Sequence, residues 1–279
     1  MAVDPDQRPR YFGGRVHALA STAGLTLAEV EYTEARTCRP HTHENAFFAM
    51  PMRGDYAELF STFRLDYRPF EIGVHPEGLQ HADAVRTPGT RFFLVELERA
   101  WMEHLHVPAS ATLGEPRLCP QQTCWLAMRL YRTLRDGLQE ASLVAESLVL
   151  EMLGSLTPEV RAVPRRRPRW LTRVIDLLHG EYAEALTIRR IAREVDLHPV
   201  YLSRAFRCHC GEGVGGYLTR LRVRSALEHL VGTDLPIAEI ALRCGFSDQS
   251  HLTRTVGKVT GITPGRLRAL SRVRRRSGR

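Results

Sequence analysis

The sequence contains no apolar run long enough to cross a membrane, which takes about 20 residues. Its first ten residues, MAVDPDQRPR, also lack the apolar segment of a secretory signal peptide. Both absences argue against a membrane partner and against export. We therefore expect a cytoplasmic protein, and its 279 residues are enough for two domains with cores of their own.

Paired CxxC motifs are absent, although the chain has six cysteines. Without a signal peptide these cysteines are expected to be reduced. The tripeptide Cys208-His209-Cys210 resembles a metal-binding motif, but neighbouring positions on a helix point in different directions. We therefore interpret it as structural or incidental. Lysine is also scarce: Lys258 is the only one in the chain.

The positive charge is concentrated in one half of the chain. Residues 1–158 contain 15 Arg or Lys against 20 Asp or Glu, a net charge of −5, whereas residues 159–279 contain 24 against 11, a net charge of +13. This asymmetry is typical of a sensor or enzyme domain joined to a domain that binds a polyanion.

The stretch PEVRAVPRRRPR, residues 158–169, separates the two halves with three prolines and an arginine run. We therefore predict a domain over residues 1–158, a linker over 159–169, a second domain over 170–270 and a basic tail over 271–279.

The acidic half is predicted to be rich in β-structure. Between about residues 25 and 100, short apolar or alternating runs such as LTLAEVEY, NAFFAMPM and RFFLVEL are broken by Pro and Gly. From about residue 125 to 156 the pattern becomes helical. Two apolar stripes follow it: Leu126, Leu130, Leu134 and Leu138, then Ala145, Leu148, Met152 and Leu156. These stripes predict either packing on the β-structure or a dimer interface.

The basic half contains a duplicated unit. The pattern I-x-x-I-A at 188–192 recurs at 237–241, and L-x-R at 202–204 recurs at 252–254. Each copy predicts a short helix, a tight corner, and a second helix with one apolar and one polar face. The second copy has one more residue in its corner.

The polar faces of the two second helices suit the major groove of DNA. Gln and Arg form paired hydrogen bonds with base edges, and Val or a Thr methyl group contacts thymine. The alternative, a helical hairpin with a solvated face, does not explain why basic charge and duplication occur together. The predicted DNA-binding residues are Pro199, Val200, Ser203, Arg204, Arg207, Gln249, Ser250, Thr253 and Arg254. Tyr201 is expected to point inward.

Residues 216–231, between the two copies, have the pattern of one continuous helix. About 16 residues at ~1.5 Å rise span roughly 24 Å. Such a strut would hold both second helices on one face, near the ~34 Å of one DNA turn. Arg220, Arg222 and Arg224 on this strut are predicted to contact phosphates.

Residues 170–270 resemble the DNA-binding domain of the AraC/XylS family of bacterial transcription regulators. The family's pattern is nearly complete in residues 237–268, IAEIALRCGFSDQSHLTRTVGKVTGITPGRLR. Its first motif is matched by residues 191–211, IAREVDLHPVYLSRAFRCHCG. The first motif departs from the family in having Asp196 where a glycine is usual. The resemblance implies that the residues named above, apart from Arg207, contact bases. It also implies double-stranded DNA as a partner, a homodimer, and RNA polymerase as a partner if the protein is an activator.

Two histidine motifs lie in the acidic half. His41-x-His43 is followed by Pro76-x-Gly78-x-x-His81, which resembles the two half-motifs of the cupin β-barrel over about residues 25–100. Many AraC-type regulators carry such a barrel as a sensor. The resemblance implies an unknown small-molecule effector in the mouth of the barrel.

In metal cupins, the ligands are two histidines of the first motif, a nearby glutamate and the histidine of the second motif. Imidazoles suit Fe, Zn, Mn or Ni, so His41, His43 and His81 are the candidate metal ligands, with His75 as a less favoured fourth. The expected glutamate position, near Phe47, is apolar. We therefore expect no metal cofactor and histidines that line a pocket or a turn; a divalent metal is the alternative.

These patterns predict an α+β fold of two domains: an N-terminal cupin-like barrel with flanking helices, and an all-α domain of two helix-turn-helix units joined by a long helix. The predicted function is a sequence-specific transcription regulator controlled by a small molecule, with no catalytic residues. One alternative is a cupin-type metal enzyme with a DNA-tethering domain. A second alternative is a nucleoid-binding protein that senses no ligand. A third is a DNA-alkylation sensor, but such a sensor needs a zinc site, and the spacing of Cys38, Cys119 and Cys124 does not support one.

Overall fold

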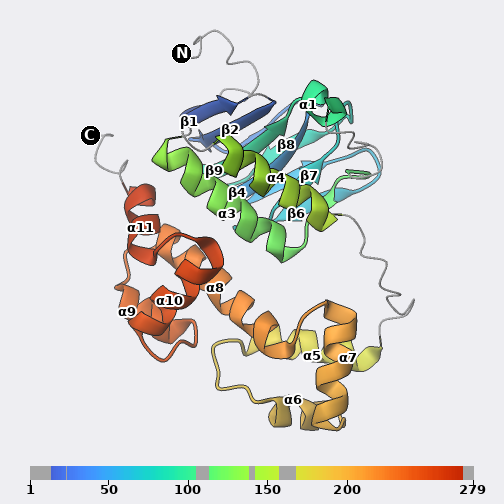
Figure 1. Ribbon diagram of the computed structural model, residues 1–279, viewed down its shortest axis with the longest axis vertical. Coiled ribbons are helices and arrows are strands. Elements are labelled where there is room, and N and C mark those ends of the chain that lie inside the picture. Colours follow the sequence, from blue (N-terminus) through green and yellow to red (C-terminus); the bar gives the residue numbers. More distant parts are fainter. Residues whose placement is uncertain (1–13, 23, 105–112, 138–141, 157–167, 273–279) are drawn as a thin grey trace. The chain divides into compact units, whose positions relative to one another are not determined.

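The computed structural model describes residues 14–22, 24–104, 113–137, 142–156 and 168–272. The chain divides into two compact units, one made of residues 1–157 and the other of nearly all residues from 158 onward. The first unit carries two sheets and the second is helical, which confirms the α+β class (Figure 1). Most of the predicted linker and basic tail lies outside the described residues. No helix in the described part of the chain is long and apolar enough to cross a membrane.

A six-stranded antiparallel sheet forms one layer of the first unit. Its strand order is β1 (Arg15–Thr22), β2 (Leu25–Tyr32), β9 (Thr90–Leu97), β4 (Ala46–Arg53), β7 (Gly73–His75) and β10 (Arg117–Leu118). The predicted runs LTLAEVEY, NAFFAMPM and RFFLVEL are its three long neighbouring strands. Most of their side chains are buried, because this sheet is covered on both faces.

A second, four-stranded antiparallel sheet has the order β3 (Arg36–Thr37), β8 (Ala82–Val85), β5 (Tyr56–Leu59) and β6 (Arg64–Tyr67). It packs against the first sheet through Tyr56, Tyr67 and Val85, which form a buried cluster with Phe92 of β9. Among the described residues the two sheets remain separate. They do not close into one barrel, so the predicted cupin barrel is not confirmed.

Two helices cover the first sheet. After the short α1 (Arg99–His104), α3 (Gln121–Asp136) and α4 (Ser142–Leu156) lie side by side, with α3 against β1 and β2 (Figure 1). The predicted stripes pack inside the unit, where the buried members are Leu130, Leu134, Ala145, Leu148, Met152 and Leu156. Leu126 is half-buried, and Leu138 lies outside the described residues.

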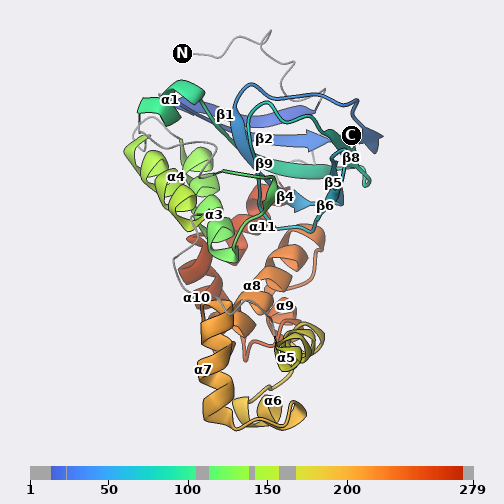
Figure 2. The same ribbon diagram turned by 90° about the vertical axis from the view of Figure 1, so that its right-hand side faces the viewer.

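The second unit contains the predicted duplication. Its helices are α5 (Arg169–Gly180), α6 (Ile188–Glu194), α7 (Pro199–Cys210), α8 (Val214–Gly232), α9 (Ile237–Arg243), α10 (Gln249–Thr260) and α11 (Pro264–Arg272). The first copy is α6 with α7 and the second is α9 with α10. The strut α8 runs between a group formed by α5, α6 and α7 and a group formed by α9, α10 and α11 (Figures 1 and 2).

Each copy packs its own apolar residues around α8. Leu202 and Phe206 of α7 are fully buried in a cluster that includes Leu218 from the first half of α8. In the second copy, Leu252 and Val256 of α10 are fully buried, and α8 contacts the neighbouring helices α9 and α11. The unit therefore has two small cores that share one long helix, and the strut predicted from the sequence is present.

Candidate nucleic-acid interface and ligand site

Both corners end their first helix in the same way. Asp196 and Gly245 have positive φ angles of 53° and 76°, the left-handed conformation that closes many helices. The N–H of Leu197 donates to the carbonyl oxygen of Ala192 at 2.9 Å, and the equivalent 2.9 Å bond in the second copy begins at Phe246. The two first helices therefore end with the same backbone geometry, although one has Asp where the other has Gly.

The second helix of each copy begins at a capping side chain. In the first copy the His198 ring accepts a hydrogen bond from the Val200 N–H at 3.4 Å. In the second copy Asp248 Oδ1 accepts from the His251 N–H at 2.7 Å. Hydrogen bonds from the His251 backbone and the Ser247 hydroxyl lower the pKa of Asp248. Its carboxylate is thus held in the charged form that the positive end of a helix favours.

Most of the predicted DNA-binding side chains are exposed on these helices. The exposed members are Val200, Ser203, Arg204, Arg207, Gln249, Ser250 and Arg254, while Pro199 and Thr253 are half-buried. Val200 has 54% of its surface exposed. An exposed apolar side chain among polar ones suits contact with a thymine methyl group. The polar faces are therefore present in both copies, and contact with DNA stays a prediction.

Tyr201 does not point inward, contrary to the expectation from helical periodicity. It is 55% exposed, and its ring centroid lies 6.4 Å from that of Trp170 on α5. Consecutive helical residues are about 100° apart around the axis. Tyr201 therefore lies at the boundary between the buried face, which Leu202 represents, and the exposed face of Val200.

The arginines of the strut are bound within the second unit. Arg220 and Arg224 form ion pairs with Glu212 and Glu228. Arg222 is bound to backbone carbonyls, as described next. These contacts lie within the unit, and the phosphate contacts of the three residues stay a prediction.

Arg222 connects the strut to the segment between α5 and α6. Its Nε donates to the carbonyl oxygen of Tyr182 at 2.7 Å, and its Nη2 donates to that of Glu184 at 2.9 Å. Between these two residues, the Ala183 carbonyl oxygen faces the corner of the second copy, where a Cβ on Gly245 would lie only 2.6 Å from it. One short segment thus contacts the strut and the corner of the second copy. No sequence motif indicates this connection.

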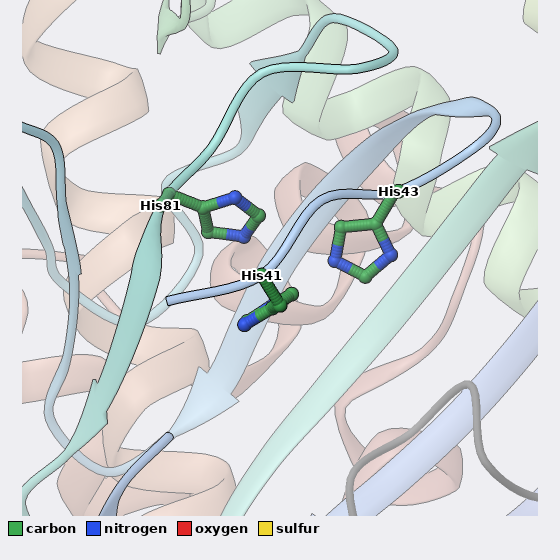
Figure 3. Close-up of side chains that lie close together, drawn as sticks. All are labelled: His41, His43 and His81. Carbon is green, nitrogen blue, oxygen red and sulfur yellow. The ribbon is translucent and has the colours of Figure 1, made fainter. Parts of the chain in front are cut away.

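The three predicted histidines come together in the first unit. The N–H of His41 and that of His81 each donate to the carbonyl oxygen of the other, at 2.8 and 3.0 Å. The His43 ring stacks on the His81 ring with a centroid distance of 5.3 Å. Each ring offers one nitrogen atom as a metal ligand, and these three nitrogen atoms lie within 4.8 Å of one another. Figure 3 shows the three side chains close together. His75 of β7 joins this histidine cluster, with its ring centroid 4.0 Å from that of His81.

Backbone carbonyls orient three of the four rings. The Nδ1 atoms of His41, His75 and His81 lie 2.8, 2.8 and 3.3 Å from backbone carbonyl oxygens. The opposite nitrogens, Nε2, of His75 and His81 are buried without a hydrogen-bond partner. Burial lowers the pKa of His43 and of His75 to about 3. These imidazoles are neutral, the form in which histidine binds metals.

The histidine cluster fits a metal ion approximately. Metal–nitrogen bonds of about 2.1 Å in tetrahedral geometry place ligand nitrogens roughly 3.4 Å apart, so the rings would have to close slightly. Phe47 stacks on the His75 ring at 4.7 Å, near the position where metal cupins have a glutamate. A carboxylate comes instead from Asp83, 3.5 Å from His41 Nε2 and 3.6 Å from His81 Nε2. Strand alternation, which puts residues 81 and 83 on one face, is the signal that points to Asp83.

A cavity of about 310 Å³ lies between the two sheets and includes His43 and Asp83 in its wall. The Tyr56 hydroxyl donates to Asp83 Oδ1 at 2.7 Å and lies 3.1 Å from Glu58 Oε1. Tyr67 donates to the other oxygen of Glu58 at 2.9 Å. Glu58 is fully buried, and burial raises its pKa to about 8. A neutral carboxyl group therefore lies behind the cavity wall, which the sequence did not indicate.

Comparisons with known proteins concern mainly the second unit. A family described as a helix-turn-helix domain matches residues 191–270. The chain is 30% identical over 116 residues to the melibiose operon regulatory protein of Escherichia coli K12, covering 42% of this chain and 38% of that protein. It is 30% identical over 130 residues to the uncharacterized HTH-type transcriptional regulator YijO of the same strain. The match covers 47% of this chain and 46% of that protein.

Among solved structures, the C-terminal domain of AraT, a response regulator from Geobacillus stearothermophilus, is similar to this chain. The sequence identity is 30% and the TM-score 0.37, over 38% of this chain and 88% of that one. The chain spans less than half the length of the two curated relatives named above. The family match confirms the predicted helix-turn-helix domain and does not extend to the first unit.

Proposed function

We propose that this chain, whose C-terminal part is an AraC-type helix-turn-helix domain, is a DNA-binding regulator of transcription. The observation that carries the proposal is the duplicated corner: two helices with exposed polar faces, α7 and α10, each begin at a cap behind the same left-handed turn. The match of residues 191–270 to the helix-turn-helix family supports it. Two relatives are named as regulators.

The two exposed faces would read base edges in the major groove. On α10, Gln249 and Arg254 suit adenine and guanine edges, and the Thr253 methyl group suits thymine. On α7, Val200 and Arg204 have the equivalent roles. Base contacts of this kind specify sequence, whereas the other exposed arginines would hold the phosphate backbone.

The first unit would sense a small molecule in its cavity. The 310 Å³ volume lies at the low end of the ~300–1,000 Å³ of small-molecule sites. A homodimer would form through the outer side of α4, where Leu143, Val144 and Leu150 are 76%, 50% and 42% exposed. RNA polymerase would be a further partner if the protein activates transcription. Replacing Leu143 and Leu150 with glutamate should give a monomer in sedimentation experiments, and a dimer that persists would place the interface elsewhere.

A divalent metal at the histidine cluster is a second candidate property of the first unit. It is favoured by the buried Nε2 atoms of His75 and His81, which accept no hydrogen bond. We do not favour the enzyme alternative, because the relatives are named as regulators. Calorimetric titration of the EDTA-treated protein with Zn²⁺ tests the site. The metal site is supported if His81→Ala abolishes zinc binding while the control His229→Gln, on α8, leaves it intact. Equal loss of binding in both variants indicates adventitious binding.

The regulator function is tested by recovering fragmented genomic DNA with the purified protein at two salt concentrations and sequencing it. Specific binding predicts a few salt-resistant fragments that share a motif, because base contacts depend on salt less than phosphate contacts do. The same experiment with Gln249 and Arg254 both replaced by alanine should lose the motif and keep weak binding. Diffuse recovery by the wild-type protein at both salts, with and without cell extract as a source of effector, would contradict the proposal.

A further inference from the structure

Carboxyl groups supply the charged part of the cavity wall. Asp83 comes from β8, Glu96 from β9 and Glu44 from the segment that precedes β4. The described residues that line the cavity include no Lys and no Arg. Aspartate and glutamate are ordinarily ionised near neutral pH, and a carboxylate shielded from water is stabilised by an opposite charge. The wall therefore provides negative charge that a bound ligand can balance.

Two hydrogen-bond donors of the wall are directed at its own carboxylates. The Tyr56 hydroxyl donates to Asp83 at 2.7 Å, and Asn45 Nδ2 donates to Glu96 Oε1 at 2.8 Å. A carboxylate has about four acceptor positions, so it can accept from more than one donor. The cavity thus matches a ligand that donates several hydrogen bonds. A polyol, which must also accept, is matched less well, and an anion is repelled.

Aromatic rings form the apolar part of the wall. The ring of Phe92 lies edge-to-face with Tyr56 and with Tyr32, at centroid distances of 4.7 and 5.7 Å, and all three residues line the cavity. Aromatic faces attract cations as well as apolar groups. Carboxylates and aromatic rings together favour a molecule with an ammonium group and an apolar body.

We propose that the effector of this protein is a small organic amine, with its ammonium group on the carboxylates of Asp83 and Glu96 and its apolar part against the rings of Tyr32 and Phe92. This rests on the regulator function proposed above, because it names the class of ligand that the sensor cavity takes. The histidine cluster is not required for amine binding, so the amine binds in the presence of EDTA.

Two matched ligand series test the proposal in calorimetric titrations of the full chain with EDTA. The first is tyramine, tyrosol and 4-hydroxyphenylacetate, which share a ring and end in an ammonium, a hydroxyl or a carboxylate. The second is butylamine, butanol and butyrate. In at least one series the amine should bind about tenfold tighter than the alcohol or more, and the acid should bind weakest. Equal or tighter binding of the alcohols or acids, or no amine binding up to about 10 mM, overturns the proposal.

Two variants locate the amine. Glu96→Gln and Asp83→Asn should each weaken amine binding about tenfold and leave alcohol binding unchanged, because a neutral amide loses the charge interaction. Glu103→Gln on α1, outside the cavity wall, is the control. Melting curves establish which variants fold. If Asp83→Asn does not fold, the test rests on Glu96→Gln. Wild-type amine affinity in folded Glu96→Gln overturns the placement.

The proposed ligand class and the proposed regulator function can be refuted independently of each other. Recovery of specific DNA fragments is measured on the same protein without added ligand and with each amine. If no motif is recovered under either condition, the regulator proposal fails whatever the titrations show. If a motif is recovered but the amine series bind no better than the alcohols, only the ligand class is wrong.

Discussion

Replacing Arg222 with alanine should loosen the connection between the two helix-turn-helix copies. Its guanidinium group holds the carbonyl oxygens of Tyr182 and Glu184 at 2.7 and 2.9 Å. The Tyr182 hydroxyl lies 2.9 Å from the Ser225 hydroxyl, which in turn lies 3.5 Å from the sulfur of Cys244 at the second corner. A series of contacts thus runs from the segment before α6 to the end of α9, through α8.

The size of the effect follows from these two hydrogen bonds. A hydrogen bond from a charged donor contributes about 1.5–3 kcal/mol. Because Arg222 is half-exposed and water can replace it at the freed carbonyls, the low end applies to each bond. Arg222→Ala should therefore cost about 2–3 kcal/mol of stability, and Arg222→Lys about half as much, since an ammonium group lacks the two-pronged geometry. Arg243→Ala, which removes only an exposed ion pair with Glu239, should cost about 0.5 kcal/mol or less.

Urea unfolding of the full chain, followed by circular dichroism, measures these differences. Hydrogen exchange of residues 181–187 measures the local effect, which should be large for Arg222→Ala and absent for Arg243→Ala. A different outcome would refute the reasoning. If Arg222→Ala leaves stability and exchange unchanged but weakens binding to all DNA sequences equally, Arg222 is a phosphate contact, as the sequence pattern suggested, and not a structural link.

Three further predictions concern the second copy and the buried carboxyl group. Gly245→Ala should cost about 2–4 kcal/mol in urea unfolding, because its left-handed φ and the Ala183 carbonyl at 2.6 Å both oppose a Cβ. Asp196→Ala, at the equivalent corner, should cost about 1 kcal/mol, and equal losses would show that the contact with Ala183 relaxes. Arg254→Ala should weaken binding to the recovered motif by about 1–3 kcal/mol but barely affect random DNA; equal weakening would assign Arg254 to phosphate. Burial raises the folded-state pKa of Glu58 to about 8. The folded protein then keeps a proton that the unfolded chain releases above its ordinary pKa of 4.5, so stability falls as pH rises from about 5 to 8. Unfolding midpoints of Glu58→Gln should show a flatter pH dependence, and an unchanged slope would mean that Glu58 is not the group responsible.

The helix-turn-helix copies were predictable because their signals are local. A helix, its cap and its corner depend on residues within about one or two turns of each other. The caps at His198 and Asp248 therefore follow from the sequence, as does the burial of Leu202 and Leu252. Tyr201 was predicted wrongly because it lies at the edge of the buried face. Whether such an edge residue is covered depends on how closely α5 packs, which helical periodicity does not contain.

Charge on the strut shows the limit of a composition argument. The sequence shows Arg222 in a basic domain, and basic charge in a DNA-binding domain favours phosphate contacts. The carbonyl oxygens that bind Arg222 belong to residues about 40 positions earlier. Backbone carbonyls have no sequence signal of their own, because every residue carries one.

The sequence by itself determined the duplication and the polar faces of α7 and α10, since each depends on a short motif. The meeting of His41, His43 and His81 was expected only from a resemblance to two cupin half-motifs. Only the tertiary structure decided the chemistry of the cavity. Asp83, Glu58 and Glu96 come together because β8 pairs with β5 and the two sheets face one another. Such pairings join segments far apart in the chain, and their register depends on the packing of the whole unit. The neighbours of a carboxylate on a strand are therefore set by strand pairing and sheet packing, which the local sequence does not contain.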